Sequence, residues 1–205
     1  MVLSTNASDI EMQAKFAAIN NFISRNIRLC LKGWKLLVNV ATMSRTFSIE
    51  VAKDYFNFAS AHFLIFANGQ REPLHGHNYQ VSVKLDGELD RAGVVLDFIT
   101  FKPMVKRICD ALDHRTLIQT KSPILRISRR AKEIEVRYRQ QKIILPKRDV
   151  LLLPLANTST ELLAEHVANQ IRRGVRQNFH SAKIRSLEVG VEEARGPRGF
   201  YRGEF

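Results

Sequence analysis

A histidine pair one residue apart opens the clearest strand pattern in the chain, and this feature constrains the fold more than any other. After His75, Gly76 and His77, the side chains alternate between apolar and polar as far as Leu85. A period of two is typical of a half-buried β-strand, in which residues two apart point to the same face. His75 and His77 can therefore direct both imidazoles to one point, and Gly76 leaves the space between them open.

A third histidine, His62, ends another strand-like run that begins at Phe56. Three imidazoles with no Cys or carboxylate ligand beside them match a catalytic zinc site that keeps one position open. A metal in such a site polarises a carbonyl or hydroxyl oxygen. A His-x-His pair also arises by chance, as two hydrogen-bonded surface histidines. Because the sequence holds only six histidines, we favour a metal site with His62, His75 and His77 as ligands.

Length and composition bound the class of protein. A chain of 205 residues can bury a full core as one domain, and 45% hydrophobic with 25% charged residues is a globular composition. Its two cysteines, Cys30 and Cys109, cannot form a disulfide framework. They suggest a reducing compartment, so we expect a cytoplasmic protein. No apolar stretch reaches the roughly 18 residues that span a bilayer, and no membrane partner is expected.

The net charge of +12 implies attraction to anions, either nucleic acid or a polyphosphate substrate. Paired Cys/His finger spacing and aromatic RNP-like strands are both missing from the sequence, so we expect no nucleic-acid partner. The charge is concentrated between Lys121 and Asp149, where ten basic residues stand against three acidic ones. This run is either a solvated face or a surface that faces phosphate groups.

Periodicity predicts an α+β fold with an antiparallel sheet covered on one face. One helix begins at Asp97 or Thr100, and its apolar stripe includes Cys109, which we interpret as a packing residue rather than a nucleophile. A second helix begins at the capping box formed by Thr158 and Glu161. Strands are predicted at 47–51, 56–62, 77–85, 184–192 and 199–202, and a basic hairpin at 134–145.

These patterns divide the chain into two parts. We interpret residues 1–42 as an N-terminal extension of uncertain order, because the recognisable pattern begins only after Met43. Residues 43–205 form the predicted domain, and the basic hairpin is an insertion at about 120–150.

Short motifs of one enzyme family occur in order along the chain: Phe58-Ala59-Ser60-Ala61-His62, Leu74-His75-Gly76-His77-Asn78-Tyr79, Gly93-Val94-Val95-Leu96-Asp97-Phe98, Leu112-Asp113-His114, Thr158-Ser159-Thr160-Glu161 and Val191-Glu192-Glu193. From about residue 45 to residue 205, the chain resembles the 6-pyruvoyl-tetrahydropterin synthase / 6-carboxytetrahydropterin synthase family. Each motif alone is weak evidence for this family. The resemblance depends on the occurrence of all six motifs in the right order and with plausible spacing.

The resemblance implies a tunnelling fold: an antiparallel four-stranded sheet with two helices on one face, joined to other subunits as an oligomeric barrel. Such closure removes exposed sheet edges. It implies a homohexamer with active sites between subunits, and Zn²⁺ held by His62, His75 and His77. The implied reaction is that of a lyase, which converts 7,8-dihydroneopterin triphosphate to 6-carboxy- or 6-pyruvoyl-tetrahydropterin.

The resemblance also implies roles for other residues. Asp113 and His114 match a catalytic Asp-His pair, in which the carboxylate fixes the imidazole tautomer; the alternative is that Asp113 only caps a helix. Glu193 matches the carboxylate that grips the pterin edge through two parallel N–H bonds; the alternative is a plain surface glutamate. Thr160 and Glu161 match a pterin-contacting segment, which the capping box explains almost as well.

One position departs from the family pattern. Many members carry a cysteine, acting as general base, four residues before the first histidine of the His-Gly-His motif, and here that residue is Arg71. Arginine stays protonated and cannot be a base, so Arg71 is expected to bind substrate phosphate. The adjacent Glu72 could replace the cysteine, as in relatives that use a glutamate in this loop and release a 6-hydroxymethyl pterin. The alternative is a solvated Glu72.

Two classes of function therefore remain open. The first is the zinc-dependent lyase, whose product, and whose pathway among queuosine, folate and biopterin, the sequence does not determine. The second is a non-catalytic zinc- and pterin-binding paralogue, which the replacement of the cysteine by Arg71 favours. The histidine triad, the Asp113–His114 pair and Glu193 favour the lyase.

Overall fold

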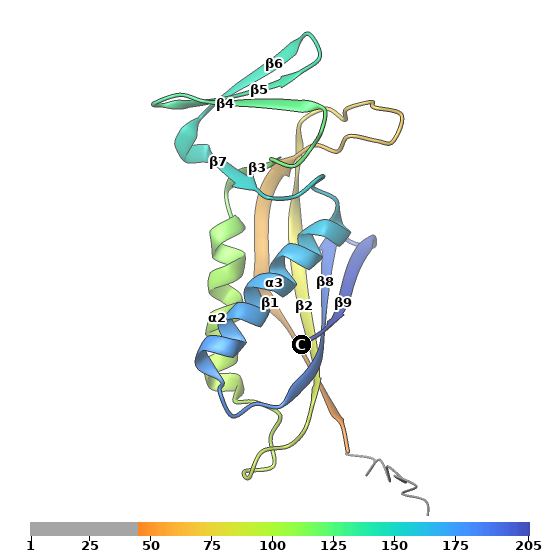
Figure 1. The fold of residues 1–205 in the computed structure, drawn as a ribbon, viewed down its shortest axis with the longest axis vertical. Coiled ribbons are helices and arrows are strands. Elements are labelled where there is room, and N and C mark those ends of the chain that lie inside the picture. Colours follow the sequence, from red (N-terminus) through yellow and green to blue (C-terminus); the bar gives the residue numbers. More distant parts are fainter. Residues whose placement is uncertain (1–44) are drawn as a thin grey trace, which may run out of the picture. The chain divides into compact units, whose positions relative to one another are not determined.

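The protein is described here by a computed structural model that covers residues 45–205. The predicted extension at residues 1–42 lies outside this range. A large mixed sheet carries both helices on one face, and a smaller sheet lies beyond one of its ends (Figure 1). The strand order of the large sheet is β7-β3-β1-β2-β8-β9. Its strands are β1 (Phe47–His62), β2 (His75–Gly87), β3 (Arg115–Gln119), β7 (Val150–Leu153), β8 (Ile184–Glu193) and β9 (Arg198–Glu204).

The expected four-stranded antiparallel sheet is present, but it is only part of the large sheet. β1, β2, β8 and β9 pair in antiparallel fashion, and β3 and β7 extend the sheet to six strands through parallel pairing. The prediction of four strands was therefore incomplete. β3 is buried at four successive positions from Thr116 to Gln119, so it lacks the alternation that reveals a half-buried strand.

β1 is a single long strand where the sequence pattern predicts two separate runs. Its register against β2 shifts between Ala52 and Asn57, which is the signature of a β-bulge or similar irregularity. The alternation is interrupted there, although the strand continues. The predicted strands near the C-terminus are confirmed, with slightly wider bounds.

Helix α2 (Phe98–Leu112) begins as predicted, because Asp97 accepts hydrogen bonds from the backbone N–H groups of Ile99 and Thr100. Helix α3 (Thr160–Asn178) begins one residue later than the predicted capping box requires. Ser159 is its N-cap, and the Thr158 hydroxyl instead donates to the Phe63 carbonyl at 3.0 Å. A tertiary contact therefore displaced the local cap.

The main core lies between the helices and one face of the large sheet. α2 packs on β1, and α3 packs on β8 and β9 (Figure 1). Cys109 is completely buried in this core, and burial raises the pKa of its thiol to about 12. This confirms a packing role. Neither helix of residues 45–205 is long and apolar enough to cross a membrane.

The basic insertion folds as a three-stranded antiparallel sheet, whereas the sequence predicted a hairpin. The hairpin corresponds to β5 (Glu133–Tyr138) and β6 (Gln141–Pro146), and β4 (Leu125–Arg129) adds a third strand. A short 3-10 helix at Lys147–Asp149 leads back to β7. A second small core joins this inserted sheet to the large one, since it combines Ile134 and Val136 of β5 with Ile118 of β3 and Phe63 after β1.

Candidate active site and metal centre

The histidine cluster forms where the paired strands β1 and β2 end. His62 lies opposite His75, and Ser60 lies opposite His77, in the antiparallel register. Alternate β1 residues from Phe56 to His62 are buried, so His62 points into the protein core. Because residues in register share a face, all three imidazoles point to the helix side of the sheet, as the sequence predicted for His75 and His77.

Backbone carbonyls orient two of these imidazoles. The Nδ1 atom of His62 lies 3.0 Å from the Thr158 carbonyl oxygen, and that of His75 lies 2.8 Å from the Pro73 carbonyl oxygen. A carbonyl oxygen can only accept, so Nδ1 carries the proton in both rings. Each ring then presents an unprotonated Nε2. Hydrogen bonds of this kind fix the tautomer of metal-binding histidines.

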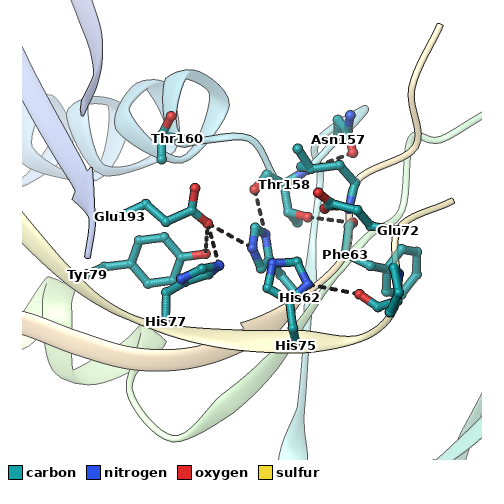
Figure 2. A network of polar contacts seen from close by, with 12 residues as sticks. His62, Phe63, Glu72, His75, His77, Tyr79, Asn157, Thr158, Thr160 and Glu193 are labelled. Atoms are coloured by element: carbon teal, nitrogen blue, oxygen red, sulfur yellow. Dashed lines mark hydrogen bonds and ion pairs between the residues drawn. The ribbon is translucent and has the colours of Figure 1, made fainter. Parts of the chain in front are cut away.

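A carboxylate from β8, which is distant in sequence but adjacent to β2 in the sheet, completes the cluster. Glu193, at the end of β8, places Oε1 3.0 Å from Nε2 of both His62 and His77. The ligand atoms of these residues and His75 all lie within 4.8 Å of one another. Figure 2 shows the side chains of the cluster converging on one small space. The sequence did not predict that Glu193 would join the histidines.

The contact between His62 and Glu193 is one that a shared cation would stabilise. Nε2 of His62 is buried and makes no hydrogen bond within residues 45–205, even though Oε1 of Glu193 is only 3.0 Å away. The distance is short, but both atoms carry lone pairs when Nδ1 holds the proton of the ring. Burial also lowers the pKa of His62, against the opposing effect of the Thr158 hydrogen bond and the Glu193 charge, which favours the neutral ring. The donor set therefore fits a divalent cation.

Tyr79 is a further member of the site that the sequence did not single out. It is completely buried, and its hydroxyl donates to Oε1 of Glu193 at 3.3 Å (Figure 2). Burial, and then the negative charges of Glu193 and Glu72, raise the pKa of Tyr79 well above its usual value. The phenol therefore stays protonated and remains a donor that holds Glu193 in place.

Glu72 lies at the edge of the same space (Figure 2). Its Oε2 accepts a hydrogen bond from the Leu64 N–H at 3.1 Å, and its own N–H donates to the Leu64 carbonyl at 2.9 Å. Its negative charge also contributes to the raised pKa of Tyr79. The neighbouring Arg71 directs its guanidinium between the rings of Phe63 and Tyr138.

Asp113 and His114 form a pair, but not with the histidine cluster. His114 Nδ1 lies 2.8 Å from an Asp113 carboxylate oxygen, and Asp113 also accepts the Ala59 N–H at 2.7 Å. Burial alone would raise the pKa of Asp113, but the Ala59 hydrogen bond and the His114 partner lower it on balance. Within residues 45–205, no hydrogen bond or ion pair joins Asp113 or His114 to the cluster. The His114 ring is 85% exposed.

The N-terminus of α3 brings the remaining predicted residues near the cluster. Figure 2 shows the Thr160 side chain on the same side as Glu193, and its hydroxyl donates to Glu161 at 3.3 Å. Glu161 itself is exposed. The preceding Asn157 and Thr158 were not predicted to matter individually. Asn157 accepts the Ile65 N–H and donates to the Ile65 carbonyl, whereas Thr158 donates its hydroxyl to the Phe63 carbonyl and accepts from the His62 ring at its own carbonyl. Only Thr158, as part of a motif, carried a sequence signal.

Comparison with known proteins gives a consistent result. Residues 50–204 match the family described as 6-pyruvoyl tetrahydropterin synthase. A putative 6-carboxy-5,6,7,8-tetrahydropterin synthase of Methanocaldococcus jannaschii is 36% identical over 148 residues, which are 71% of this chain and 88% of that protein.

Solved structures of similar fold come from Plasmodium vivax. The crystal structure of its 6-pyruvoyl tetrahydropterin synthase has a TM-score of 0.74 and 29% identity, over 79% of this chain and all of that chain. Two variants of that protein, in which a glutamate described as a catalytic residue is replaced by alanine or cysteine, have the same TM-score at 28% identity and the same coverage.

Proposed function

Because the chain belongs to the 6-pyruvoyl tetrahydropterin synthase family, we propose that it is a zinc-dependent lyase acting on 7,8-dihydroneopterin triphosphate to give a 6-substituted pterin. The observation that carries this proposal is the convergence of His62, His75, His77 and Glu193, whose ligand atoms lie within 4.8 Å of one another, with Glu72 at the edge of the same space. A cation site beside a free carboxylate has the parts that proton removal next to a polarised oxygen requires.

His62, His75 and His77 are the proposed zinc ligands, because their ligand nitrogens lie within 4.8 Å of one another and of the Glu193 carboxylate. Zinc held there would polarise substrate oxygens and make the adjacent protons more acidic. Tyr79 keeps Glu193 oriented through its hydroxyl. In this proposal Glu193 accepts the N–H groups of the pterin edge, with help from Thr160 and Glu161 at the start of α3.

Glu72 is the proposed general base. Its Oε2 is held by the Leu64 N–H, while its Oε1 makes no hydrogen bond within residues 45–205 and is available to a substrate proton. Such a carboxylate can take the place of the cysteine that Arg71 replaces. The Plasmodium vivax protein whose catalytic residue is a glutamate supports this assignment.

Two different pterin products are each supported by one observation. Two relatives, from Methanocaldococcus jannaschii and Pyrococcus horikoshii, carry the name putative 6-carboxy-5,6,7,8-tetrahydropterin synthase, which favours a 6-carboxy or 6-pyruvoyl product. Glu72 in place of a cysteine favours the second candidate, cleavage to a 6-hydroxymethyl-dihydropterin. Within residues 45–205, no hydrogen bond or ion pair connects the Asp113–His114 pair to the histidine cluster. In both candidate reactions, the pair would therefore assist only if a second subunit brought it to the cluster.

The deciding experiment incubates the purified protein with 7,8-dihydroneopterin triphosphate and identifies the pterin released by mass spectrometry. Glu72→Gln keeps the shape and removes the basicity, so it should lower kcat about 10²–10⁴-fold while zinc content stays at the wild-type level. Turnover by Glu72→Gln at the wild-type rate would transfer the base role to another group. A fully metal-loaded wild type without turnover would favour a non-catalytic pterin-binding protein.

A further inference from the structure

Arg71 joins the loop that carries Glu72 to the inserted sheet. This loop, residues 63–74, connects β1 to β2 and is called the Glu72 loop below. The Arg71 Cζ atom lies 5.2 Å from the ring centroid of Phe63 and 5.8 Å from that of Tyr138. Phe63 directly follows β1 and is completely buried, whereas Tyr138 ends β5 of the insertion. Both distances are within the range of cation–π attraction.

The hydrogen bonds of Arg71 point in two directions. Nη1 donates to the carbonyl oxygen of Glu72 at 2.6 Å, and Nη2 donates to Oε1 of Gln141 at 3.2 Å. A guanidinium is planar and offers donors in a fixed fork, so it can stack on rings and bond in its plane at once. The first bond holds the peptide unit of Glu72, and the second ties it to the start of β6.

Other contacts reinforce the same junction. The Tyr138 hydroxyl donates to the Gly69 carbonyl, and the Arg139 guanidinium lies 3.4 Å from that oxygen. An isolated antiparallel β-bridge pairs Ile65 with Arg71 and so holds the two arms of the loop together. The turn between β5 and β6 therefore holds the tip of the Glu72 loop, and Arg71 holds its return to β2.

We propose that Arg71 is a positioning residue for Glu72, and that the inserted sheet serves as the support against which it acts. This inference rests on the proposed role of Glu72 as general base. In this proposal the arginine at the usual cysteine position acts through its planar shape and its directed hydrogen bonds, as well as through its charge. It fixes the backbone of the next residue so that the Glu72 carboxylate faces the histidine cluster.

The effect of loosening this junction can be large. A displacement of about 1 Å at a reacting group costs on the order of 10²-fold in rate. Arg71→Gln removes the charge and the fork, and Arg71→Lys keeps the charge but loses the planar group. Both variants should lower kcat about 10–100-fold, with KM changed less than about threefold and with zinc retained.

A readout that does not depend on turnover is the exchange rate of the Leu64 amide. This N–H donates to Oε2 of Glu72, so its protection from hydrogen exchange reports where the carboxylate lies. In Arg71→Gln and Arg71→Lys, Leu64 protection should fall about tenfold or more, while protection at Val83 in the centre of β2 stays unchanged. Tyr138→Leu removes the aromatic ring beside the Arg71 guanidinium and the hydroxyl that donates to the Gly69 carbonyl. It should have the same effect.

Arg126→Ala is the matched control. Arg126 lies exposed on β4 of the same sheet, and no hydrogen bond or ion pair within residues 45–205 connects it to the Glu72 loop. Its removal lowers the positive charge by the same amount, so Leu64 protection, kcat and KM should remain at wild-type values.

Three outcomes decide the proposal. If Arg71→Gln raises KM and makes KM less dependent on salt concentration, while kcat and Leu64 protection stay unchanged, Arg71 binds substrate phosphate and the positioning role is wrong. If the variant only lowers Tm, with kcat and Leu64 protection unchanged below the transition, its role is general stability and the proposal is again wrong. Loss of Leu64 protection in a protein whose wild type shows no turnover supports the positioning role and refutes the proposed enzyme.

Discussion

His62 is the residue on which the metal assignment depends most, because its Nε2 is buried against Glu193 without a proton to share. We predict one zinc per chain, with Nε2 of His62, His75 and His77 at about 2.0–2.1 Å from the metal. Elemental analysis should therefore show stoichiometric zinc in the wild type and its loss in His75→Ala and His77→Ala. His180→Ala, at an exposed histidine after α3, is the control. Full zinc retention in both cluster variants would contradict the site.

Glu193 has two possible partners, and a single substitution separates them. If the carboxylate grips the pterin edge, Glu193→Gln should raise KM about 10–100-fold, since a hydrogen bond to a charged group contributes about 1.5–3 kcal/mol, while zinc stays bound. Glu192→Gln, at the adjacent residue that pairs with Arg198, should leave KM unchanged. Loss of zinc from Glu193→Gln would instead make Glu193 a metal ligand.

Among the elements, α3 connects the fold to the site. Thr158, just before its N-cap, accepts a hydrogen bond from His62, and Thr160, its first residue, lies on the same side as Glu193 (Figure 2). The strand β9 packs tightly against this end. A Cβ atom at Gly199 would lie 2.5 Å from the Glu161 backbone nitrogen and 2.7 Å from the Thr160 carbonyl carbon. Backbone atoms cannot move aside as a side chain can.

Gly199→Ala should therefore displace the start of α3 and destabilise the protein by about 1–3 kcal/mol. The measurement is the free energy of unfolding in denaturant, accompanied by zinc content. Gly203→Ala on the same strand is the matched control, since its Cβ would meet only the ends of the Tyr201 and Arg172 side chains. Equal stability of the two variants would show that β9 does not constrain α3.

At the scale of the whole molecule, the large sheet of residues 45–205 ends in two edge strands, β7 and β9. Within residues 45–205, β7 pairs only with β3, and β9 pairs only with β8. Unpaired edges favour association with other strands, and the Asp113–His114 pair lies apart from the cluster in one chain. We predict a homo-oligomer, expected as a hexamer, whose mass light scattering can measure. A stable monomer at micromolar concentration would exclude the barrel and leave Asp113 and His114 without a catalytic role.

A second prediction at this scale concerns residues 1–42, which lie outside the described structure. The family match begins at residue 50, and every residue assigned to the site follows it. A chain that starts at Met43 should therefore fold, bind zinc and keep the activity of the full chain. Loss of zinc from the shortened protein would show that the extension belongs to the domain.

The sequence by itself determined the features that neighbouring residues encode. Alternation fixed the strand that follows His77, and the spacing of His75 and His77 fixed their common face. The sequence narrowed the start of α2 to Asp97 or Thr100, and Asp97 is the N-cap. It also identified the buried Cys109. These predictions hold because strand pleat, helix period and capping depend on residues a few positions apart.

Only the tertiary structure decided the features that distant residues create. Glu193 reaches Tyr79 across 114 positions, Thr158 accepts from His62 across 96 positions, and Arg71 reaches Gln141 across 70. β3 and β7 join the sheet through parallel pairing. The sequence did not reveal β3 because it is buried at four successive positions and so lacks alternation. No local pattern specifies which backbone a loop will meet, so the orientation of Glu72 and the partner of Arg71 follow from packing.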